Sequence, residues 1–259
     1  MKENVFQAYS AYYDLLYRDK DYSKETGYVC KSLRSINPDV KTVLEFGSGT
    51  GKHGRLLAQQ GFQVTGIELS ETMVASAQSI APDPEDSTQG SFECITGDVR
   101  TAGFDRTFDA VISLFHVVSY QTTNEDLRAT FSNAARHLKR GGQFFFDVWH
   151  GPSVLRERPA VRVKILEDEN IRVRRIAEPK LDTNQSVVTV HYTMLIESKD
   201  NQNLTAFEEE HRMRYLFPTE IALLAERTGF EVRRAEEFVT GKTPDESTWG
   251  VAYLLVKTA

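Results

Sequence analysis

The residues with the clearest chemical meaning form one run, Glu45-Phe46-Gly47-Ser48-Gly49-Thr50-Gly51. This run directly follows the apolar stretch Lys41–Phe46 and precedes a helical pattern. Glycines at such a place let the chain turn sharply and let a ligand approach the backbone closely. The N-terminus of the helix that follows presents free N–H groups and positive partial charge. The run therefore predicts a site suited to a ligand carboxylate or phosphate.

Three nucleotide-binding interpretations compete for this run. A P-loop would need glycine where Phe46 stands and serine or threonine where His53 stands, so the sequence excludes it. A dinucleotide turn is spelled literally by Gly49-x-Gly51-x-x-Gly54, but this interpretation leaves Glu45 unexplained. The whole run resembles motif I of the class I methyltransferases, and the resemblance implies S-adenosyl-L-methionine as the cofactor.

The resemblance implies roles for residues further along the chain. Glu68 closes the second predicted strand, where an acid can bind both ribose hydroxyls, as it also does in dinucleotide enzymes. Asp98 would accept the adenine amino group and the backbone N–H of Val99 would meet a ring nitrogen, with Leu69 and Met73 flanking the base. The alternative for Glu68 and Asp98 is that both are solvated strand ends. The other residues assigned to the cofactor on this basis are Tyr13, Tyr22, Glu45, Gly47, Ser48, Gly49, Gly51, His53 and Leu114.

The N-terminal residues extend the resemblance to a narrower group. Tyr13-Asp14-Leu15-Leu16-Tyr17, followed by Lys20-Asp21-Tyr22, resembles the N-terminal lid of the sugar-nucleotide amino N,N-dimethyltransferases of deoxysugar biosynthesis. The implied acceptor is the amino group of a nucleotide-linked amino sugar. Two features depart from the group: His116 stands where a small hydroxyl residue is expected, and His150-Gly151-Pro152 forms a different turn.

The catalytic candidates lie on the lid and after predicted strands. Methyl transfer leaves the protein to position the reactants, exclude water and remove a proton. On the lid resemblance Tyr17 would lie over the transferring methyl group; its alternative is packing on the core. His116 follows the fourth strand, and its imidazole could accept a proton near neutral pH, or it could be a satisfied loop histidine. Trp149 and His150 follow the fifth strand and would face the acceptor.

The elements needed to position these residues follow from hydrophobic periodicity. Short apolar runs alternate with helical patterns, which is typical of a parallel sheet. The predicted fold class is α/β: a Rossmann-like, doubly wound, mostly parallel seven-stranded sheet with an inserted antiparallel β-subdomain and an N-terminal helical lid. The predicted strands of the core are 41–46, 62–68, 92–96, 108–114, 143–148, 230–238 and 250–256, with helices at 52–60, 70–79, 124–138 and 218–227.

The chain divides into four predicted segments: the lid 1–40, the cofactor-binding core 41–152, the inserted β-subdomain 153–217 and the completion of the sheet 218–259. Alternating polar and apolar residues in the insertion indicate antiparallel strands with one wet face. Arg172 and Arg174 share a face of one such strand. They could bind the diphosphate of a nucleotide sugar or form a solvated face. The insertion could equally pair two subunits into a homodimer.

The composition narrows the function classes. A formal net charge of −6 weighs against a nucleic-acid partner. The two cysteines, Cys30 and Cys94, make neither a disulfide framework nor a metal site, and no metal-binding constellation is evident. The sequence lacks a signal-peptide pattern and any apolar run of about 20 residues, so we expect a cytoplasmic protein without a membrane partner.

The sequence thus predicts S-adenosylmethionine-dependent methylation of a small polar acceptor, with an amino sugar as the first choice. Another small-molecule O- or N-methyltransferase is the nearest alternative. A cofactor-binding module without catalysis comes next, and a nicotinamide dehydrogenase is third.

Overall fold

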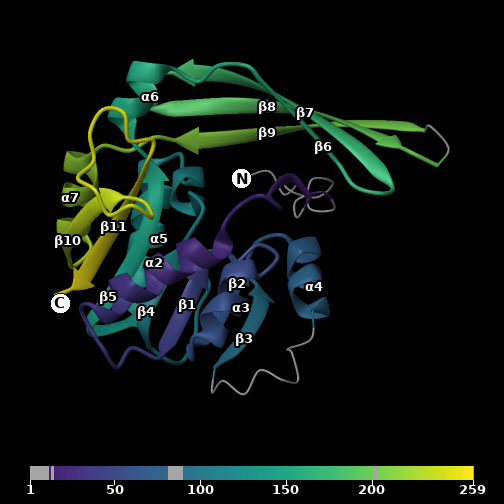
Figure 1. Ribbon diagram of the computed structural model, residues 1–259. Coiled ribbons are helices and arrows are strands. Elements are labelled where there is room, and N and C mark those ends of the chain that lie inside the picture. The colour runs from purple at the N-terminus through teal and green to yellow at the C-terminus, as the bar shows by residue number, and fades with distance from the viewer. Residues whose placement is uncertain (1–11, 13–14, 81–89, 201–202, 259) are drawn as a thin grey trace.

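The computed structural model describes residues 12, 15–80, 90–200 and 203–258 (Figure 1). Its central sheet has seven strands in the order β10-β11-β5-β4-β1-β2-β3. Strands β1 to β5 pair in parallel, whereas β11 is antiparallel to both β5 and β10. The bounds are β1 Thr42–Phe46, β2 Gln63–Glu68, β3 Ser91–Thr96, β4 Phe108–Ser113, β5 Leu138–Trp149, β10 Phe230–Glu237 and β11 Gly250–Lys257.

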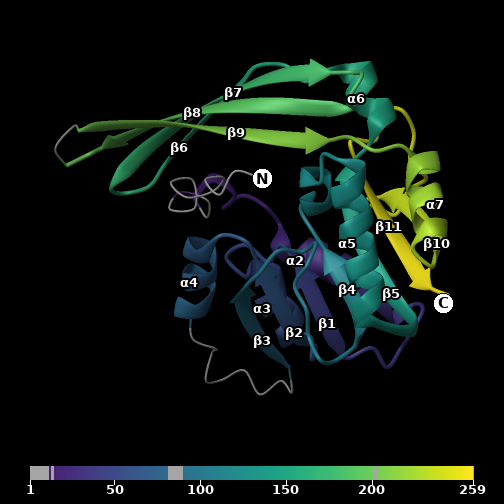
Figure 2. The ribbon, with the colours of Figure 1, turned by 180° about the vertical axis from the view of Figure 1, so that it is seen from behind.

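Helices cover both faces of this sheet (Figures 1 and 2). Alternate residues of β5 show why: Phe144 and Phe146 belong to one buried cluster, while Phe145 between them belongs to another. The first cluster includes residues of α5 and α7, and the second includes residues of α2 and α3. Helix α4 packs beside β2 and β3. The helix bounds are α2 Tyr22–Arg34, α3 Lys52–Gln59, α4 Glu71–Ser79, α5 Asn124–His137 and α7 Pro218–Arg227.

A separate antiparallel sheet, here called the β-subdomain, extends over one end of the core (Figures 1 and 2). Its strands are β6 Arg162–Glu167, β7 Ile171–Asp182, β8 Val187–Ser198 and β9 Leu204–Arg214, paired in that order. Leu16 and Tyr17 pack against Val173 and Met194 on its inner face. The predicted fold class is therefore confirmed, including the inserted antiparallel sheet. The segment boundaries at residues 40, 152 and 217 stay predictions.

Two short helices were missed by the sequence interpretation. The 3₁₀-helix η1, Val117–Tyr120, follows β4, and the helix α6, Gly151–Glu157, follows β5. Pro152 occupies the first turn of α6, a helix-start signal that we interpreted as a turn. Strand β5 also begins earlier than predicted, at Leu138. Its pairing with β4 shifts register between Phe108 and Ala110, and this irregularity accommodates Gly141 at a φ of 80° within the strand.

Among the helices of the described residues, none is long and apolar enough to cross a membrane.

Candidate active site

The glycine turn after β1 contains three glycines with a left-handed backbone conformation, and their surroundings differ. Gly47, Gly49 and Gly51 have φ values of 71°, 57° and 76°. A Cβ on Gly47 would lie 2.5 Å from Val117, and one on Gly51 would lie 2.6 Å from Phe92, so packing alone requires glycine there. A Cβ on Gly49 would meet nothing within 4 Å. The backbone at Gly49 therefore faces open space that a ligand can enter.

Glu45 lies beneath this turn and is almost completely buried. The Ser48 hydroxyl donates to its Oε2 at 2.5 Å. Burial raises the pKa of Glu45 to about 7, against the opposing influence of His53 and Ser48. His53 is itself buried in α3, and its Nε2 lies 2.8 Å from Oε2 of Glu25 in α2. This contact ties the lid helix to the first turn of α3, where we had expected His53 to contact the methionine carboxylate.

The Glu68 carboxylate closes β2 directly beside the turn. It accepts the backbone N–H of Gly49 at 3.0 Å and that of Ser70 at 2.9 Å. Glu68 is only 8% exposed, so it is not a solvated strand end, and burial raises its pKa. The backbone N–H of Leu69 also acts on this carboxylate. A carboxylate offers about four lone-pair positions, so Glu68 keeps acceptor capacity for a ligand hydroxyl. Nearby, Leu69 is exposed and Met73 is buried. Both lie at the N-terminus of α4, where the Ser70 hydroxyl accepts the backbone N–H of Met73.

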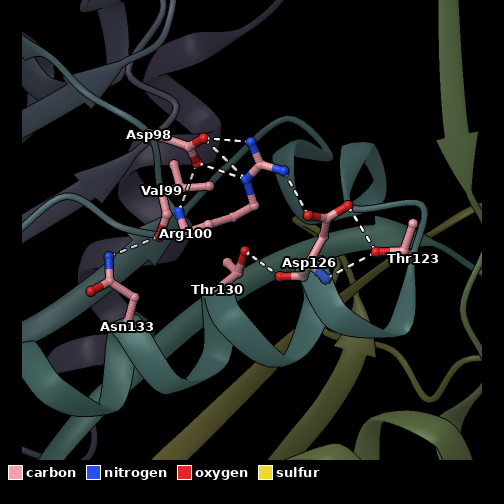
Figure 3. A network of polar contacts seen from close by, with 7 residues as sticks. All are labelled: Asp98, Val99, Arg100, Thr123, Asp126, Thr130 and Asn133. Carbon is pink, nitrogen blue, oxygen red and sulfur yellow. Dashed lines mark hydrogen bonds and ion pairs between the residues drawn. The ribbon is translucent and has the colours of Figure 1, made fainter. Parts of the chain in front are cut away.

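Asp98 follows β3, and its carboxylate accepts hydrogen bonds from an arginine (Figure 3). Arg100 donates to it from its backbone N–H, its Nε and its Nη2. Burial alone would raise the pKa of Asp98, but the hydrogen bonds from Arg100 outweigh burial and hold it below its ordinary value. Asp98 therefore stays an ionised acceptor at the end of β3, next to the buried Val99.

The residues after β4 and β5 form a buried His–Asp pair. Nδ1 of His116 lies 2.6 Å from Oδ2 of Asp147, and the backbone N–H of His116 donates to the same carboxylate at 3.2 Å. Burial tends to raise the pKa of Asp147, which is 1% exposed, but His116 outweighs burial and lowers it. Phe115 and His116 both have φ of 63°, which is rare for such residues and typical of functional sites. The contact leaves Nε2 as the ring nitrogen that can exchange a proton with a ligand.

Tyr17 joins this pair to the β-subdomain. Its ring meets Phe115 edge-on at 4.9 Å between centroids, and Nη1 of Arg175 in β7 donates to its hydroxyl at 3.3 Å. The Lys20 ammonium lies 4.3 Å from the centroid of Phe115 and pairs with Glu25. The lid, the end of β4 and the inner face of β7 therefore meet at Tyr17.

A second polar cluster lies on the inner face of the β-subdomain. The hydroxyl of Tyr120 in η1 lies 2.8 Å from Nδ1 of His211, whose Nε2 lies 3.2 Å from Glu209. The ring of Tyr192 packs edge-on against His211 at 4.9 Å. The side chains of His211 and Glu209 are almost fully buried. This cluster faces the region above the carboxyl ends of the core strands.

The arginines proposed for a diphosphate occupy the other face. Arg172 pairs with Glu167 at 3.1 Å and Arg174 pairs with Glu197 at 3.0 Å. The inner face belongs to the alternate residues, among them Val173 and Arg175. The hypothesis that Arg172 and Arg174 bind substrate phosphate at this site was therefore wrong, because the side chains alternate away from it.

The remaining candidates have mixed positions. Tyr22 packs on His53 with 4.9 Å between centroids, and Leu114 is buried at the end of β4. Trp149 is half-buried and its ring lies 6.3 Å from that of His116. His150 is buried beneath it, at the start of α6. Tyr13 lies outside the described residues.

Sequence reasoning missed Asp147, Arg100 and His211. Asp147 did carry a signal, since it is a lone acid inside the apolar run from Phe144 to Val148 and such an acid needs a partner when buried. Arg100 and His211 had no local signal. Within the described part of the chain, no group of three or more His, Cys, Asp or Glu is arranged to hold a metal ion.

Comparisons with known proteins agree with this geometry. A family model described as a methyltransferase domain matches residues 43–142. A dTDP-3-amino-3,4,6-trideoxy-α-D-glucopyranose N,N-dimethyltransferase from Streptomyces venezuelae is 27% identical over 232 residues, covering 89% of this chain and 93% of that relative. The structure of an amino pentose methyltransferase from Micromonospora echinaspora, with S-adenosylmethionine bound, is 25% identical with a TM-score of 0.75 and covers 98% of each chain. An S-adenosylmethionine-dependent methyltransferase from Clostridium acetobutylicum shares the fold with a TM-score of 0.80 at 19% identity, over 99% of this chain and 100% of that one.

Replacing Glu45 by glutamine should change how stability depends on pH. The pKa of Glu45 is about 7 in the folded chain against an ordinary 4.5, so between these values the unfolded chain releases a proton that the folded chain keeps. This single group should therefore lower the free energy of unfolding as pH rises through that window, by roughly 3 kcal/mol. Glu45→Gln removes this loss.

Urea unfolding of the ligand-free protein between pH 4 and 8 would measure the difference between the two proteins. Glu45→Gln should gain on the parent chain as pH rises to 7, and the gain should then level off. The exposed Glu71, changed to glutamine, controls for the removal of one charge. A difference between parent and Glu45→Gln that stays constant over the whole range would contradict the pKa assigned to Glu45.

Proposed function

We propose that this chain, which belongs to the class I S-adenosylmethionine-dependent methyltransferases, methylates the amino group of a nucleotide-linked amino sugar. The observation that carries the proposal is the extent of the similarity. The relatives named as methyltransferases of sugar amines match the lid and the β-subdomain as well as the cofactor half.

The residues around the glycine turn fit S-adenosylmethionine. The open space at Gly49 admits a ligand close to the backbone. The remaining acceptor capacity of Glu68 suits the ribose hydroxyls, and Asp98 with the N–H of Val99 suits the adenine edge. We assign the flanks of the base to Leu69 and Met73, and the lid side to Tyr22 together with Tyr13. When bound, the cofactor supplies a methyl group already activated on a sulfonium sulfur.

The chain's own contribution to the reaction is a proton acceptor and a fixed geometry. An amine attacks only in its neutral form, so its ammonium group must lose a proton before transfer. Nε2 of His116 can take that proton while the buried Asp147 holds Nδ1 and stabilises the resulting imidazolium. Tyr17, fixed between Phe115 and Arg175, orients the reacting groups.

The acceptor side is assigned to the ends of β5 and to the β-subdomain. Trp149 presents a half-buried ring on which a sugar or base can stack. The half-buried Tyr120, whose hydroxyl contacts His211, adds a polar group. His150 was expected to face the acceptor, but its burial suits packing, so Trp149 alone keeps that role.

A hydroxyl acceptor is the second candidate, and the His–Asp pair favours it specifically. A hydroxyl needs a general base more than an amine does, and His116 with Asp147 is arranged as one. A cofactor-binding module without catalysis would have no need for that buried pair. A substrate panel that includes amino sugars and their hydroxyl counterparts distinguishes the two acceptors.

Replacing Glu68 by alanine should weaken binding of S-adenosylhomocysteine on the order of 100-fold, because two hydrogen bonds to a charged acceptor are lost. Isothermal titration calorimetry measures the dissociation constant directly. Glu71→Ala, the same change three residues further on at an exposed site, should leave binding unchanged. Equal binding by Glu68→Ala and the parent chain would remove Glu68 from the cofactor site.

Replacing His116 by asparagine should lower the rate of methyl transfer by about 100-fold or more, since it removes the general base. Asparagine tolerates the positive φ at this position, so the backbone should be preserved. The assay is single-turnover mass spectrometry with a dTDP-linked 3-amino sugar, in which each transferred methyl group is seen as a mass increase.

Two further variants sharpen this test. Asp147→Asn should lower the rate by less than His116→Asn, because it disturbs the orientation of the imidazole and leaves the base in place. His191→Asn, on the exposed partner of Glu208, should behave as the parent. A His116→Asn protein with the parent rate would exclude the His–Asp pair as the base. Transfer to the hydroxyl counterpart but not to the amine would overturn the acceptor.

We propose that two copies of the chain pair through the β-subdomain. Its strand β6 exposes Val163 and Ile165 on one face, at 62% and 59%, and lies at an edge of the sheet formed by the described strands. Lysine at both positions should convert a dimer into a monomer in light scattering after size exclusion. Leu223→Lys, at a similarly exposed site on α7, should have no effect. A monomeric parent chain would contradict this assembly.

A further inference from the structure

We infer that Arg100 is a positioning residue for adenine recognition, fixing the acceptor geometry of Asp98 and joining it to the N-terminus of α5 (Figure 3). The inference rests on the proposed contact between Asp98 and the adenine amino group. No part of it depends on the acceptor substrate.

The contacts at Asp98 fix both the plane and the charge of its carboxylate. Nε of Arg100 lies 2.9 Å from Oδ1 and 3.1 Å from Oδ2, and Nη2 lies 2.5 Å from Oδ2. The backbone N–H of Arg100 also donates to Oδ1 at 2.9 Å. A planar guanidinium fork holds a carboxylate in its own plane, which a lysine ammonium cannot do. Asp98 is therefore prevented from turning about its side-chain bonds.

The other end of Arg100 is fixed by the first turn of α5. Nη1 donates to Oδ1 of Asp126 at 2.6 Å, and the Thr123 hydroxyl donates to Oδ2 of Asp126 at 2.9 Å. Thr123 is the N-cap of α5 and accepts the backbone N–H of Asp126 at 3.0 Å. The side chains of Arg100, Asp98 and Asp126 are between 21% and 26% exposed. This network is more sheltered from solvent than an ordinary surface ion pair, and it should contribute more.

The backbone beside Asp98 is anchored to the same helix. Nδ2 of Asn133 donates to the carbonyl of Val99 at 2.9 Å and to that of Ala102 at 3.1 Å. The loop after β3 is thus attached to α5 by Asn133 at its backbone and by Arg100 at its acidic side chain. Both groups assigned to the adenine edge, the Asp98 carboxylate and the Val99 N–H, take their positions from α5.

The lone-pair count shows what this arrangement selects. A carboxylate has about four acceptor positions, and the three N–H donors of Arg100 use two on Oδ1 and one on Oδ2, with the Nε donor also reaching Oδ2 at a longer 3.1 Å. The described contacts leave one position, which only a hydrogen-bond donor can use. The 6-amino group of adenine is such a donor, whereas a purine with hydrogen at that carbon has nothing to offer. Arg100 should therefore increase the preference for the amino group rather than affinity in general.

The test is calorimetric binding of two probes, S-adenosylhomocysteine and its 6-deamino analogue with purine in place of adenine. The ratio of their dissociation constants measures the contribution of the amino group. A hydrogen bond to a charged acceptor predicts a ratio of about 10 or more for the parent chain. Arg100→Ala should reduce the ratio to about 3, and Asp98→Ala should bring it close to 1. Arg100→Lys keeps the charge without the fork and should fall between Arg100→Ala and the parent.

Two controls separate positioning from general damage. The double variant Asp98→Ala with Arg100→Ala should match Asp98→Ala alone, because Arg100 acts through Asp98. Arg106→Ala removes an exposed arginine that pairs with Glu93 at 2.8 Å, and it should leave the ratio at the parent value. If Arg100→Ala does not fold, as judged by circular dichroism, Asp126→Asn replaces it. That variant loosens the far end of the network and should lower the ratio at least about twofold.

The possible results distinguish this inference from the proposed site. A ratio that Asp98→Ala lowers but that Arg100→Ala, Arg100→Lys and Asp126→Asn leave unchanged overturns the role of Arg100 alone. A ratio that survives Asp98→Ala overturns the adenine contact and the inference with it. Equal weakening of both probes in Arg100→Ala assigns Arg100 a purely structural role. Failure of the parent chain to bind S-adenosylhomocysteine would instead reject the cofactor site as a whole.

Discussion

Parallel pairing of β1 with β2 and β4, extended to β3 and β5, makes the carboxyl ends of five strands meet at one edge of the sheet. The groups assigned to the cofactor's adenosine, and the proposed base, lie at this edge. The glycine turn follows β1, Glu68 ends β2, Asp98 follows β3, His116 follows β4 and Trp149 ends β5. The register of these pairs decides the distances between groups that lie far apart in sequence. The sheet thus determines where the site lies, and each loop contributes mainly through the strand end at which it begins.

This edge is also where the chain tolerates unfavourable structure. Two buried acids, Glu45 and Glu68, lie side by side with pKa values raised by burial. Phe115 and His116 both adopt a left-handed backbone, at a cost of roughly 1–3 kcal/mol each. Val117 then packs so closely on Gly47 that no side chain fits between them. The apolar clusters on both faces of the sheet stabilise the fold enough to hold these features in place.

Periodicity in the sequence was enough to predict the strands and their order of appearance, because alternate burial is a local property of each strand. It also located Glu68, Asp98 and His116, since each directly follows an apolar run. It could not reveal that Asp147 reaches His116 or that His211 reaches Tyr120. Those contacts depend on inter-strand register and on how the β-subdomain folds over the core. The same limit applies to the burial of His150 and to the outward direction of Arg172 and Arg174. Whether such a side chain points inward or outward depends on how its strand or helix packs, which the sequence pattern does not determine.

The lid shows how local and distant constraints combine. Leu16 is fully buried among Val173, Met194 and Ile196 of the β-subdomain, so the segment before α2 is held from above. Glu25 in α2 contacts His53 in α3, which holds the same segment from below. Tyr17 lies between these two attachments and against Phe115, where its position is set by both domains at once. The position of Tyr17 over the end of β4 is thus fixed by contacts from both sides, through Phe115 and through Arg175 of β7, rather than by the lid alone.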